Sequence, residues 1–421
     1  MDINQLLGGV HCACGEHHTC DIEAVYIERG AMKRLTDLCA PYESILLVAD
    51  ENTYAAAGEK TEEALKGKIA ARVIFGKELL IPDEKATERV LASLGRASLI
   101  VGIGSGVIQD LSKYASKLSS VPYMVVATAP SMDGYASTGA AMILGGMKET
   151  VSAGLPRAIV ADTEVLKNAP MPMLRAGFGD IVGKYSALSD WKLATAVTGE
   201  RFCPYIYGVT YEMIERVIGM AKGITARDEE SIGALMEALI IVGIMMSFLG
   251  TSRPASGSEH HLSHFFEIAG IVKNEPYLTH GIDVAYSTVV TARIREKLRA
   301  LPFPNFRFRE DAEETKKKLA AAYGEKVGAG CVALQKKVGA YERDLTAVYL
   351  AKEDEIKKIL AEVPGTDEIL SLLATVGLEM EEFTTLYGEE KIATAIRHAK
   401  DLKDRYTVLW LYYDLFGEEA I

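Results

Sequence analysis

Four of the eight histidines in this chain of 421 residues lie close together in the sequence, at His260, His261, His264 and His280. His260 and His264 are four residues apart, so they share a face if their segment is helical. His280 and Asp180 each stand at the start of a further predicted helix. One carboxylate and two imidazoles from separate helices predict an open divalent metal site, with positions left for water or substrate. Spacing does not choose between His260 and His261, and such residues at helix starts are often only caps or buried polar groups.

A glycine-rich turn, Val101-Gly-Ile-Gly-Ser-Gly106, could bind a phosphate group. It follows an apolar run and opens a predicted helix, so backbone N–H groups and the helix dipole would favour a pyrophosphate there. The turn departs from the pattern G-x-G-x-x-G, because Gln109 stands at the third glycine position. A tight connection between a strand and a helix explains the glycines equally well. Asp50, at the end of an earlier predicted strand, is placed to receive a ribose, and it could equally cap the next helix.

Two further segments carry polar groups that could bind ligands. Thr128–Thr138 follows a predicted strand at its carboxyl end, where ligands bind in open α/β sheets, and it holds several hydroxyls and Asp133. The alternative is a polar loop. Near the N-terminus, His11-Cys-Ala-Cys-Gly-Glu-His-His-Thr-Cys20 offers enough soft ligands for a structural zinc ion. However, Cys12 and Cys14 do not have the usual C-x₂-C spacing, so this segment could equally be a reduced N-terminal arm.

The elements that must position these residues form two regions. Short apolar runs alternate with helical patterns in the first 160 or so residues, which is typical of a parallel sheet covered on both faces. The predicted strands are 45–50, 71–75, 98–102, 122–127 and 158–161, and the predicted helices between them are 52–65, 84–94 and 107–117. After about Thr163 the spacing is helical, over 173–197, 231–249, 280–298, 309–338, 345–362 and 391–406. We therefore predict an α/β fold with a nucleotide-binding domain at 1–162 and an all-helical domain at 163–421, with a cleft between them.

Composition narrows the class of protein. The formal net charge is −12, and such a surface repels nucleic acid and anionic lipid. The N-terminus lacks the pattern of a signal peptide, and the longest apolar run, Ala238–Gly250, is too short to span a bilayer and predicts a buried core helix. Six sparse cysteines do not make a disulfide framework. We expect a reduced, cytoplasmic protein without membrane insertion or nucleic acid partners.

The blocks that carry these groups resemble the sn-glycerol-1-phosphate dehydrogenases, within the superfamily of iron-type alcohol dehydrogenases, glycerol dehydrogenases and dehydroquinate synthases. The resemblance runs from about Val25 to about Val290 and is closer to the bacterial branch than to the archaeal one. The most specific blocks are Thr128-Ala-Pro-Ser-x-Asp-Gly, Gly177-Phe-Gly-Asp-x-x-Gly-Lys-Tyr-x-x-Leu-x-Asp-Trp191 and Ser252-Arg-Pro-Ala-Ser-Gly-Ser-Glu-His-His-x-Ser-His264.

The resemblance assigns roles that spacing leaves open. It implies a Rossmann-like N-terminal domain, a helical C-terminal domain of the dehydroquinate synthase type and a homodimer. It also implies NAD(H), with NADP(H) possible, and one divalent metal ion, zinc or nickel with iron possible. The implied metal ligands are Asp180, His260 and His280; the substrate contacts are Asp133, Asp180 and His264; and Asp180 and His264 are the catalytic residues. The implied cofactor contacts are Asp50, Gly104, Ser105, Gly106, Val107, Ile108, Gln109, Asp110, Thr128, Ala129, Pro130, Ser131 and Ser137.

The expected reaction is the interconversion of dihydroxyacetone phosphate and sn-glycerol 1-phosphate. Arg253 and Lys184 are candidates for gripping the phosphate by their chemistry alone, and both could equally be ion-pair residues. The first alternative is a dehydrogenase of the same superfamily that acts on glycerol or another alcohol. A dehydroquinate synthase-like lyase is disfavoured, because a glutamate is expected there in place of Asp180. A non-catalytic nucleotide-binding regulator should have lost metal ligands, and all three are present.

Overall fold

The computed structural model describes residues 3–145, 147–309 and 311–417. Contacts divide the chain into two compact units, Met1–Ile181 with Glu215–Ser252 and Val182–Ile214 with Arg253–Ile421. Two of the three points of division fall inside long helices, α7 (Met171–Thr198) and α8 (Pro204–Gly219), which continue through them and are therefore shared by both units. The change from sheet to helices comes earlier, where β10 ends at Asp162 and α6 (Thr163–Leu166) begins.

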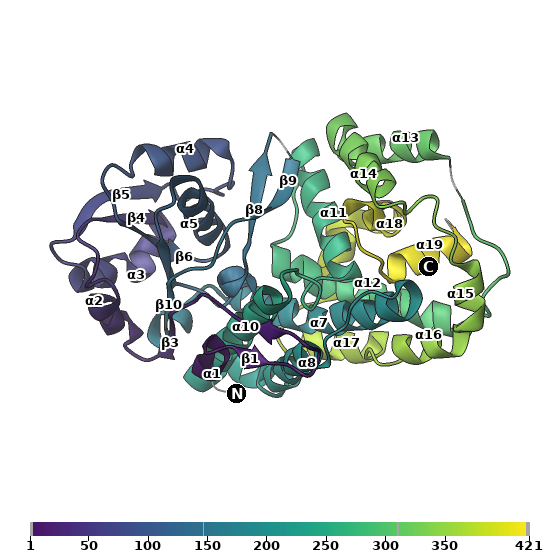
Figure 1. Cartoon of the computed structure of the whole chain (residues 1–421), viewed down its shortest axis with the longest axis horizontal. Helices are drawn as coiled ribbons and strands as arrows, with labels where there is room; N and C mark the ends of the chain where they lie inside the picture. The colour runs from purple at the N-terminus through teal and green to yellow at the C-terminus, as the bar shows by residue number, and fades with distance from the viewer. Residues whose placement is uncertain (1–2, 146, 310, 418–421) are drawn as a thin grey trace. The chain divides into compact units, whose positions relative to one another are not determined.

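The first unit is built on a parallel sheet of six strands in the order β3-β10-β7-β6-β4-β5 (Figure 1). The strands are β3 (Ala24–Glu28), β4 (Ile45–Asp50), β5 (Ile69–Phe75), β6 (Leu99–Gly104), β7 (Tyr123–Ala127) and β10 (Ala158–Asp162). From β4 the chain moves outward to β5 and then returns to β6 on the other side of β4. The strand order therefore reverses between β4 and β6, and ligands of open α/β sheets bind outside the carboxyl ends of strands at such a point.

Alternate residues of the strands face different helices, as the period of two requires. Val101 belongs to a buried apolar cluster with residues of α2 (Arg34–Leu38) and α3 (Glu51–Ala64). Gly102 and Gly104 face α5 (Gly106–Ser119) instead, where an added Cβ would lie 2.5 Å from Ser112 Oγ and 2.6 Å from Ile108 Cβ. These two glycines therefore let α5 approach β6 closely.

The remaining elements of the first unit are short helices, two hairpins and one long helix. They are α1 (Ile3–Leu7), α4 (Glu84–Ala92), α9 (Ala221–Thr225), α10 (Glu229–Leu249), and the antiparallel pairs β1 (Val10–His11) with β2 (His17–His18) and β8 (Gly139–Leu144) with β9 (Met147–Ser152). Among the described residues, only α10 is long and apolar enough to cross a membrane by length and composition, and 78% of its most apolar window is buried inside the protein.

The second unit is helical in the residues that the structure describes. α11 (Ser258–Lys273) packs along α12 (His280–Ala300). Around them lie α13 (Ala312–Tyr323), α14 (Glu325–Lys337), α15 (Thr346–Ala351), α16 (Glu353–Leu360), α17 (Thr366–Ala374), α18 (Met380–His398) and α19 (Val408–Phe416).

The predicted fold class, a parallel-sheet α/β region followed by a helical region, is confirmed. All five predicted strands exist, with ends within about two residues of the prediction. β3, which forms an edge of the sheet beside β10, and both hairpins were not predicted. The single helix predicted over 309–338 is two helices, α13 and α14, separated at Gly324 with φ of +81°.

Candidate metal and cofactor site

Three histidines cluster where α11 meets the start of α12. His260 and His264 lie one turn apart on α11, as their spacing predicted, and His280 is the first residue of α12. The ring centroid of His280 lies 5.0 Å from that of His260 and 5.5 Å from that of His264. His260 is buried, whereas His264 and His280 are partly exposed. The cluster therefore presents imidazole nitrogens from two helices to one small volume.

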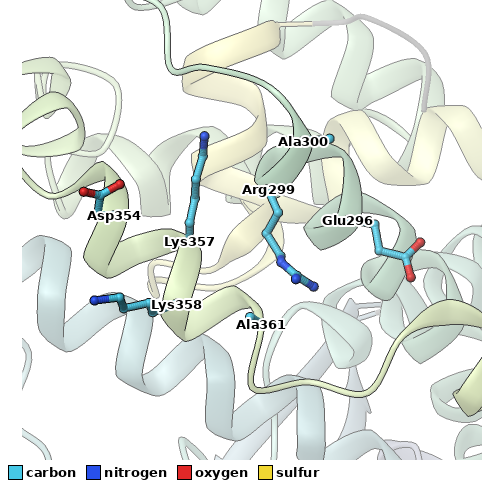
Figure 2. Close-up of a pocket in the computed structure, with 7 residues that line it drawn as sticks. All are labelled: Glu296, Arg299, Ala300, Asp354, Lys357, Lys358 and Ala361. Atoms are coloured by element: carbon cyan, nitrogen blue, oxygen red, sulfur yellow. The ribbon is translucent and has the colours of Figure 1, made fainter.

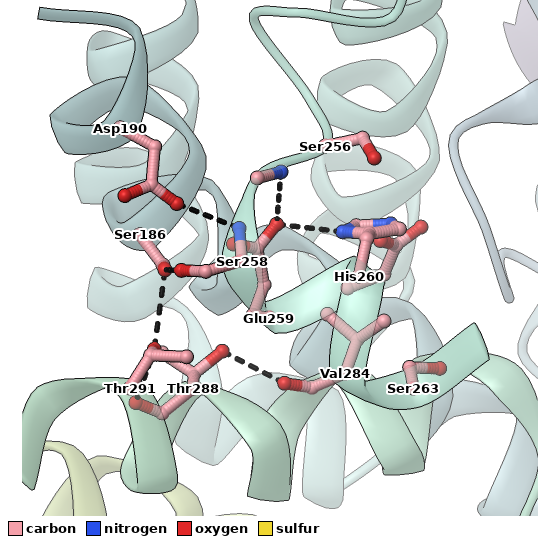
Figure 3. Close-up of polar contacts among 12 residues, drawn as sticks. Ser186, Asp190, Ser256, Ser258, Glu259, His260, Ser263, Val284, Thr288 and Thr291 are labelled. Atoms are coloured by element: carbon pink, nitrogen blue, oxygen red, sulfur yellow. Dashed lines mark hydrogen bonds and ion pairs between the residues drawn. The ribbon is translucent and has the colours of Figure 1, made fainter. Parts of the chain in front are cut away.

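A buried carboxylate that the sequence analysis did not single out fixes the ring of His260. Glu259 Oε1 lies 2.7 Å from His260 Nδ1 and also accepts a hydrogen bond of 2.8 Å from the Gly257 N–H (Figure 3). Burial would raise the pKa of Glu259, but the hydrogen bond and charge of His260 and the Gly257 N–H together lower it, so Glu259 is a carboxylate. Because a carboxylate only accepts, His260 Nδ1 carries the hydrogen and Nε2 keeps its lone pair, which is the form that binds a metal.

Asp190 holds the start of the helix that carries His260. Its Oδ2 accepts a hydrogen bond of 2.6 Å from the Ser258 N–H at the first residue of α11 (Figure 3). Its Oδ1 accepts from the Val408 N–H at 2.9 Å and from the guanidinium of Arg295 at 2.9 Å. Asp190 and Arg295 are both buried. One carboxylate thus joins α7, α11, α12 and α19.

The prediction that Asp180 stands at the start of a helix is wrong: Asp180 is fully buried inside α7, which begins at Met171. Its Oδ2 accepts a hydrogen bond of 3.0 Å from the Asp133 N–H, which fixes the carboxylate. One ligand atom each of Asp180, His260 and His280 lies within 4.8 Å of the others. This donor set suits zinc, nickel or ferrous iron.

Gly177 allows α7 to approach the loop that follows β7. A Cβ at Gly177 would lie 1.9 Å from the carbonyl oxygen of Pro130, so no other residue fits without moving the backbone. Pro130 belongs to the predicted cofactor segment 128–131. Gly177 therefore has a packing role that brings the predicted cofactor loop against the helix carrying the metal ligand.

The start of α5 has the features of an anion site. Asp50, Asp83 and Asp228 cap α3, α4 and α10 with side-chain hydrogen bonds, but no side chain caps α5. Its N-cap residue, Ser105, directs its hydroxyl to that of Ser131 instead. The first N–H groups of α5 are therefore not used by a side-chain cap, and they lie at the carboxyl end of β6, beside the reversal of strand order.

Asp50 proves to be a helix cap, as one of its two interpretations predicted. Its Oδ1 accepts a hydrogen bond of 2.8 Å from the Thr53 N–H, and Thr53 Oγ1 accepts one of 3.1 Å from the Asp50 N–H. This reciprocal capping box does not exclude a ribose contact, since Asp50 lies at the carboxyl end of β4 and is partly exposed. Its role toward a cofactor stays a prediction.

The buried Lys113, which the sequence analysis missed, anchors the loop after Asp133. Its Nζ donates to the carbonyl oxygens of Gly134, Ser137 and Gly139 at 3.1, 2.8 and 2.7 Å. Burial lowers the pKa of Lys113 to about 8, against the opposing charges of Asp110 and Asp133. A lysine within an amphipathic helix normally predicts a solvated face, so only the fold shows its role in positioning Ser137.

The remaining predicted cofactor residues lie where the turn and loop were expected. Val107, Ile108, Gln109 and Asp110 form the first turns of α5 after Gly104, Ser105 and Gly106, and Thr128, Ala129, Pro130 and Ser131 follow β7. Gln109 donates to the carbonyl oxygen of Gly134 at 3.0 Å, so this departure from the glycine pattern has a structural use. The contacts of these residues with a cofactor remain predictions.

Two basic side chains proposed for phosphate differ in their surroundings. Arg253 is buried and pairs with Glu200 through two hydrogen bonds of 2.7 and 2.6 Å, and it donates to the Tyr406 carbonyl at 2.7 Å. These contacts give Arg253 a structural role. Lys184 is fully buried on α7, one turn after Asp180. The phosphate contact of either residue stays a prediction.

A surface hollow of about 580 Å³ in the second unit contains none of the predicted site residues. It is lined by Glu296, Arg299, Ala300, Asp354, Lys357, Lys358 and Ala361, from α12, α16 and the residue after α16 (Figure 2). Glu296 accepts two hydrogen bonds from Thr366, and Lys357 pairs with Glu353 at 2.7 Å. The hollow's charged groups are thus partly used within the fold, and it offers no metal-ligating histidine.

Known proteins resemble the chain over nearly its whole length. Residues 26–170 match the iron-containing alcohol dehydrogenase family. The glycerol-1-phosphate dehydrogenase [NAD(P)+] of Geobacillus stearothermophilus is 30% identical over 418 residues, which cover 97% of this chain and 96% of the relative. The enzyme of the same name from Halalkalibacterium halodurans is 30% identical over 410 residues, covering 95% and 94%.

Solved structures share the fold at low sequence identity. The sulfoacetaldehyde reductase of Bifidobacterium kashiwanohense, solved in complex with NAD+, superposes with a TM-score of 0.62 at 13% identity and covers 94% of this chain and 97% of its own. At this identity the likeness concerns the fold alone.

Proposed function

Because the chain belongs to the glycerol-1-phosphate dehydrogenase [NAD(P)+] family, we propose that it interconverts dihydroxyacetone phosphate and sn-glycerol 1-phosphate. The observation that carries the proposal is the grouping of Asp180, His260 and His280, in which Glu259 holds His260 in its ligand form. We propose that these three residues bind one catalytic divalent ion. We further propose that the protein is a cytoplasmic homodimer.

The residues of the site have separable tasks in this proposal. When bound, the nicotinamide would supply a hydride, and the ion would supply Lewis acidity at the ketone oxygen. Asp180 and His280 would complete the ligand set around His260. The uncapped start of α5 would hold the cofactor's pyrophosphate, and the fixed loop 128–131 would hold the nicotinamide half. Orientation of the ketone between these groups fixes the handedness of the product.

His264 and Asp133 would act on the substrate directly. His264 lies one turn beyond His260 and is partly exposed, so it can hold or deliver the proton that the product hydroxyl gains. Asp133 lies beside Asp180, because its N–H donates to that carboxylate. Lys184, one turn after Asp180, would pair with the phosphate.

The test is an assay of NADH oxidation with dihydroxyacetone phosphate and with unphosphorylated dihydroxyacetone, and of phosphate release from the dehydroquinate precursor, followed by analysis of product handedness. We expect the phosphorylated ketone to have the highest kcat/KM and the product to be sn-glycerol 1-phosphate. Formation of sn-glycerol 3-phosphate, or a higher kcat/KM for unphosphorylated dihydroxyacetone, would refute the proposal.

Asp50 should favour NADH over NADPH, because a carboxylate accepts hydrogen bonds from a free 2′-hydroxyl and repels a 2′-phosphate. Asparagine caps helices as well as aspartate does but carries no charge. Asp50→Asn should therefore narrow the ratio of kcat/KM for NADH and NADPH while leaving the melting temperature nearly unchanged. The capping residue Asp83→Asn is the matched control and should leave the ratio unchanged. An Asp50→Asn enzyme with an unchanged ratio would mean that Asp50 is only a cap.

A further inference from the structure

The cysteine and histidine residues near the N-terminus form a second group with the chemistry of a metal site. Cys12 and Cys14 stand in the turn between β1 and β2, and His18 ends β2. One ligand atom each of Cys12, Cys14, His18 and Cys203 lies within 4.8 Å of the others. Cys203 immediately precedes Pro204, the first residue of α8, a helix that runs unbroken into the first unit.

His18 is held in the form that binds metals. Its Nδ1 lies 3.1 Å from the carbonyl oxygen of Phe248, near the end of α10, and its ring stacks on that of Phe248. A carbonyl oxygen only accepts, so Nδ1 carries the hydrogen and Nε2 keeps its lone pair. Nε2 lies 3.4 Å from Cys14 Sγ. That distance fits two neighbouring ligands of one tetrahedral zinc ion, whose S···N edge is about 3.5 Å from bond lengths of about 2.0 and 2.3 Å.

The turn also orients the sulfur of Cys12. The Cys14 N–H points to Cys12 Sγ at 3.4 Å. Gly15, with φ of +92°, allows the chain to turn back at once, and the Gly15 N–H bonds to the Cys12 carbonyl. This local geometry brings two sulfurs to one side of a hairpin although only one residue separates them.

The hairpin has little else to stabilise it. Each of its strands is two residues long, and an isolated hairpin of that length is marginal in water. Between Gly9 and Cys20, only His18 and Cys20 are buried. A closed metal site stabilises such small segments without an apolar core.

We propose that Cys12, Cys14, His18 and Cys203 bind a second, structural metal ion, zinc by the chemistry of its ligands, which fixes the N-terminal hairpin. Three thiolates and one imidazole make a closed set with no position for substrate, unlike the aspartate and two histidines of the catalytic site. Cys20 is not part of the group, although it is close in the sequence.

The test is cobalt substitution in the purified full-length protein, because only a thiolate-bound cobalt ion gives an intense sulfur-to-metal charge-transfer band. We expect this band in the wild type and in His260→Ala, which removes only a catalytic ligand. Cys14→Ser should lose the band together with one zinc ion per chain. Cys20→Ser and His17→Ala, which change neighbouring residues outside the group, should retain both.

The wild-type spectrum decides the question even if Cys14→Ser fails to fold. A cobalt-loaded wild type without the charge-transfer band, or a disulfide among these cysteines in the freshly isolated protein, would overturn the inference. Either result would leave the proposed reaction standing, because that reaction is tested by turnover. Conversely, an inactive protein that shows the band would refute the reaction and support this site.

Discussion

The protein should lose its catalytic metal ion and nearly all turnover when His260 is replaced by alanine. His260 is one of only three protein ligands proposed for the ion, and its ring is fixed by Glu259 in the ligand form. An ion that polarises the ketone stabilises the transition state by several kcal/mol. We therefore expect kcat/KM for dihydroxyacetone phosphate to fall by about 10³-fold or more, since each 1.36 kcal/mol is tenfold. Metal content should fall by one ion per chain.

His264→Ala should separate substrate chemistry from metal binding. His264 lies on the same face of α11 as His260, but it is outside the group of three ligands. Its loss should reduce kcat by about 10²-fold or more, in the range typical of general acid–base residues, while the metal content stays that of the wild type. If His264→Ala lost the ion and His260→Ala retained it, the metal ligand on α11 would be His264 and not His260.

His261 is the matched control on the same helix. It is rotated by about 100° from His260. It is fully buried, and burial, with the charges of Lys403, Arg405 and Arg253, lowers its pKa well below the usual value, so it is neutral. Neither ring nitrogen has a hydrogen-bond partner among the described residues. His261→Leu should therefore keep both the metal and the activity, with any change confined to stability.

Local patterns were sufficient for the elements that lie in the middle of the sheet. β4, β6 and β7 are apolar runs buried on both faces, and each is bounded by a turn signal, so their position in a parallel sheet could be predicted. β3 was missed because an edge strand has neighbours on one side only, and its five residues alternate weakly between buried and exposed. In the sequence, the dipeptide Gly145-Gly146 is a turn signal that could have indicated the hairpin of β8 and β9.

The site residues could be predicted only in part, because some of them are selected by tertiary contacts and not by a local pattern. Residue types and spacing selected Asp180 and the histidines, but the choice of His260 over His261 depends on which face of α11 meets the rest of the site, and that is a tertiary property. The resemblance supplied the choice. Glu259 and Lys113 are hydrogen-bonded partners of other groups, so their importance depends on contacts that no sequence pattern encodes. Glu259 directly precedes His260 in the sequence, and this position was the only sequence signal for its role.

Asp190→Ala should be the most destabilising single change near the site. Its carboxylate accepts from two backbone N–H groups at the starts of α11 and α19 and pairs with Arg295, and both charged side chains are buried. Removing one partner of a buried ion pair leaves a charge without compensation. We expect the free energy of unfolding, measured by equilibrium urea denaturation, to fall by about 3–5 kcal/mol.

Two comparisons make this expectation specific to the buried pair. Glu362→Ala breaks the pair of Lys192 and Glu362, which lies two residues further along α7 but is exposed, and it should cost less than about 1 kcal/mol. The double variant Asp190→Ala, Arg295→Leu removes both buried charges, so it should cost less than the sum of the two single changes. The structural role of Asp190 would be contradicted if Asp190→Ala were no more destabilising than Glu362→Ala. The double variant also covers the case in which Asp190→Ala is too unstable to fold at all. Folded protein recovered in the double variant would then support the same structural role, because it would show that the uncompensated charge of Arg295 prevents the single variant from folding.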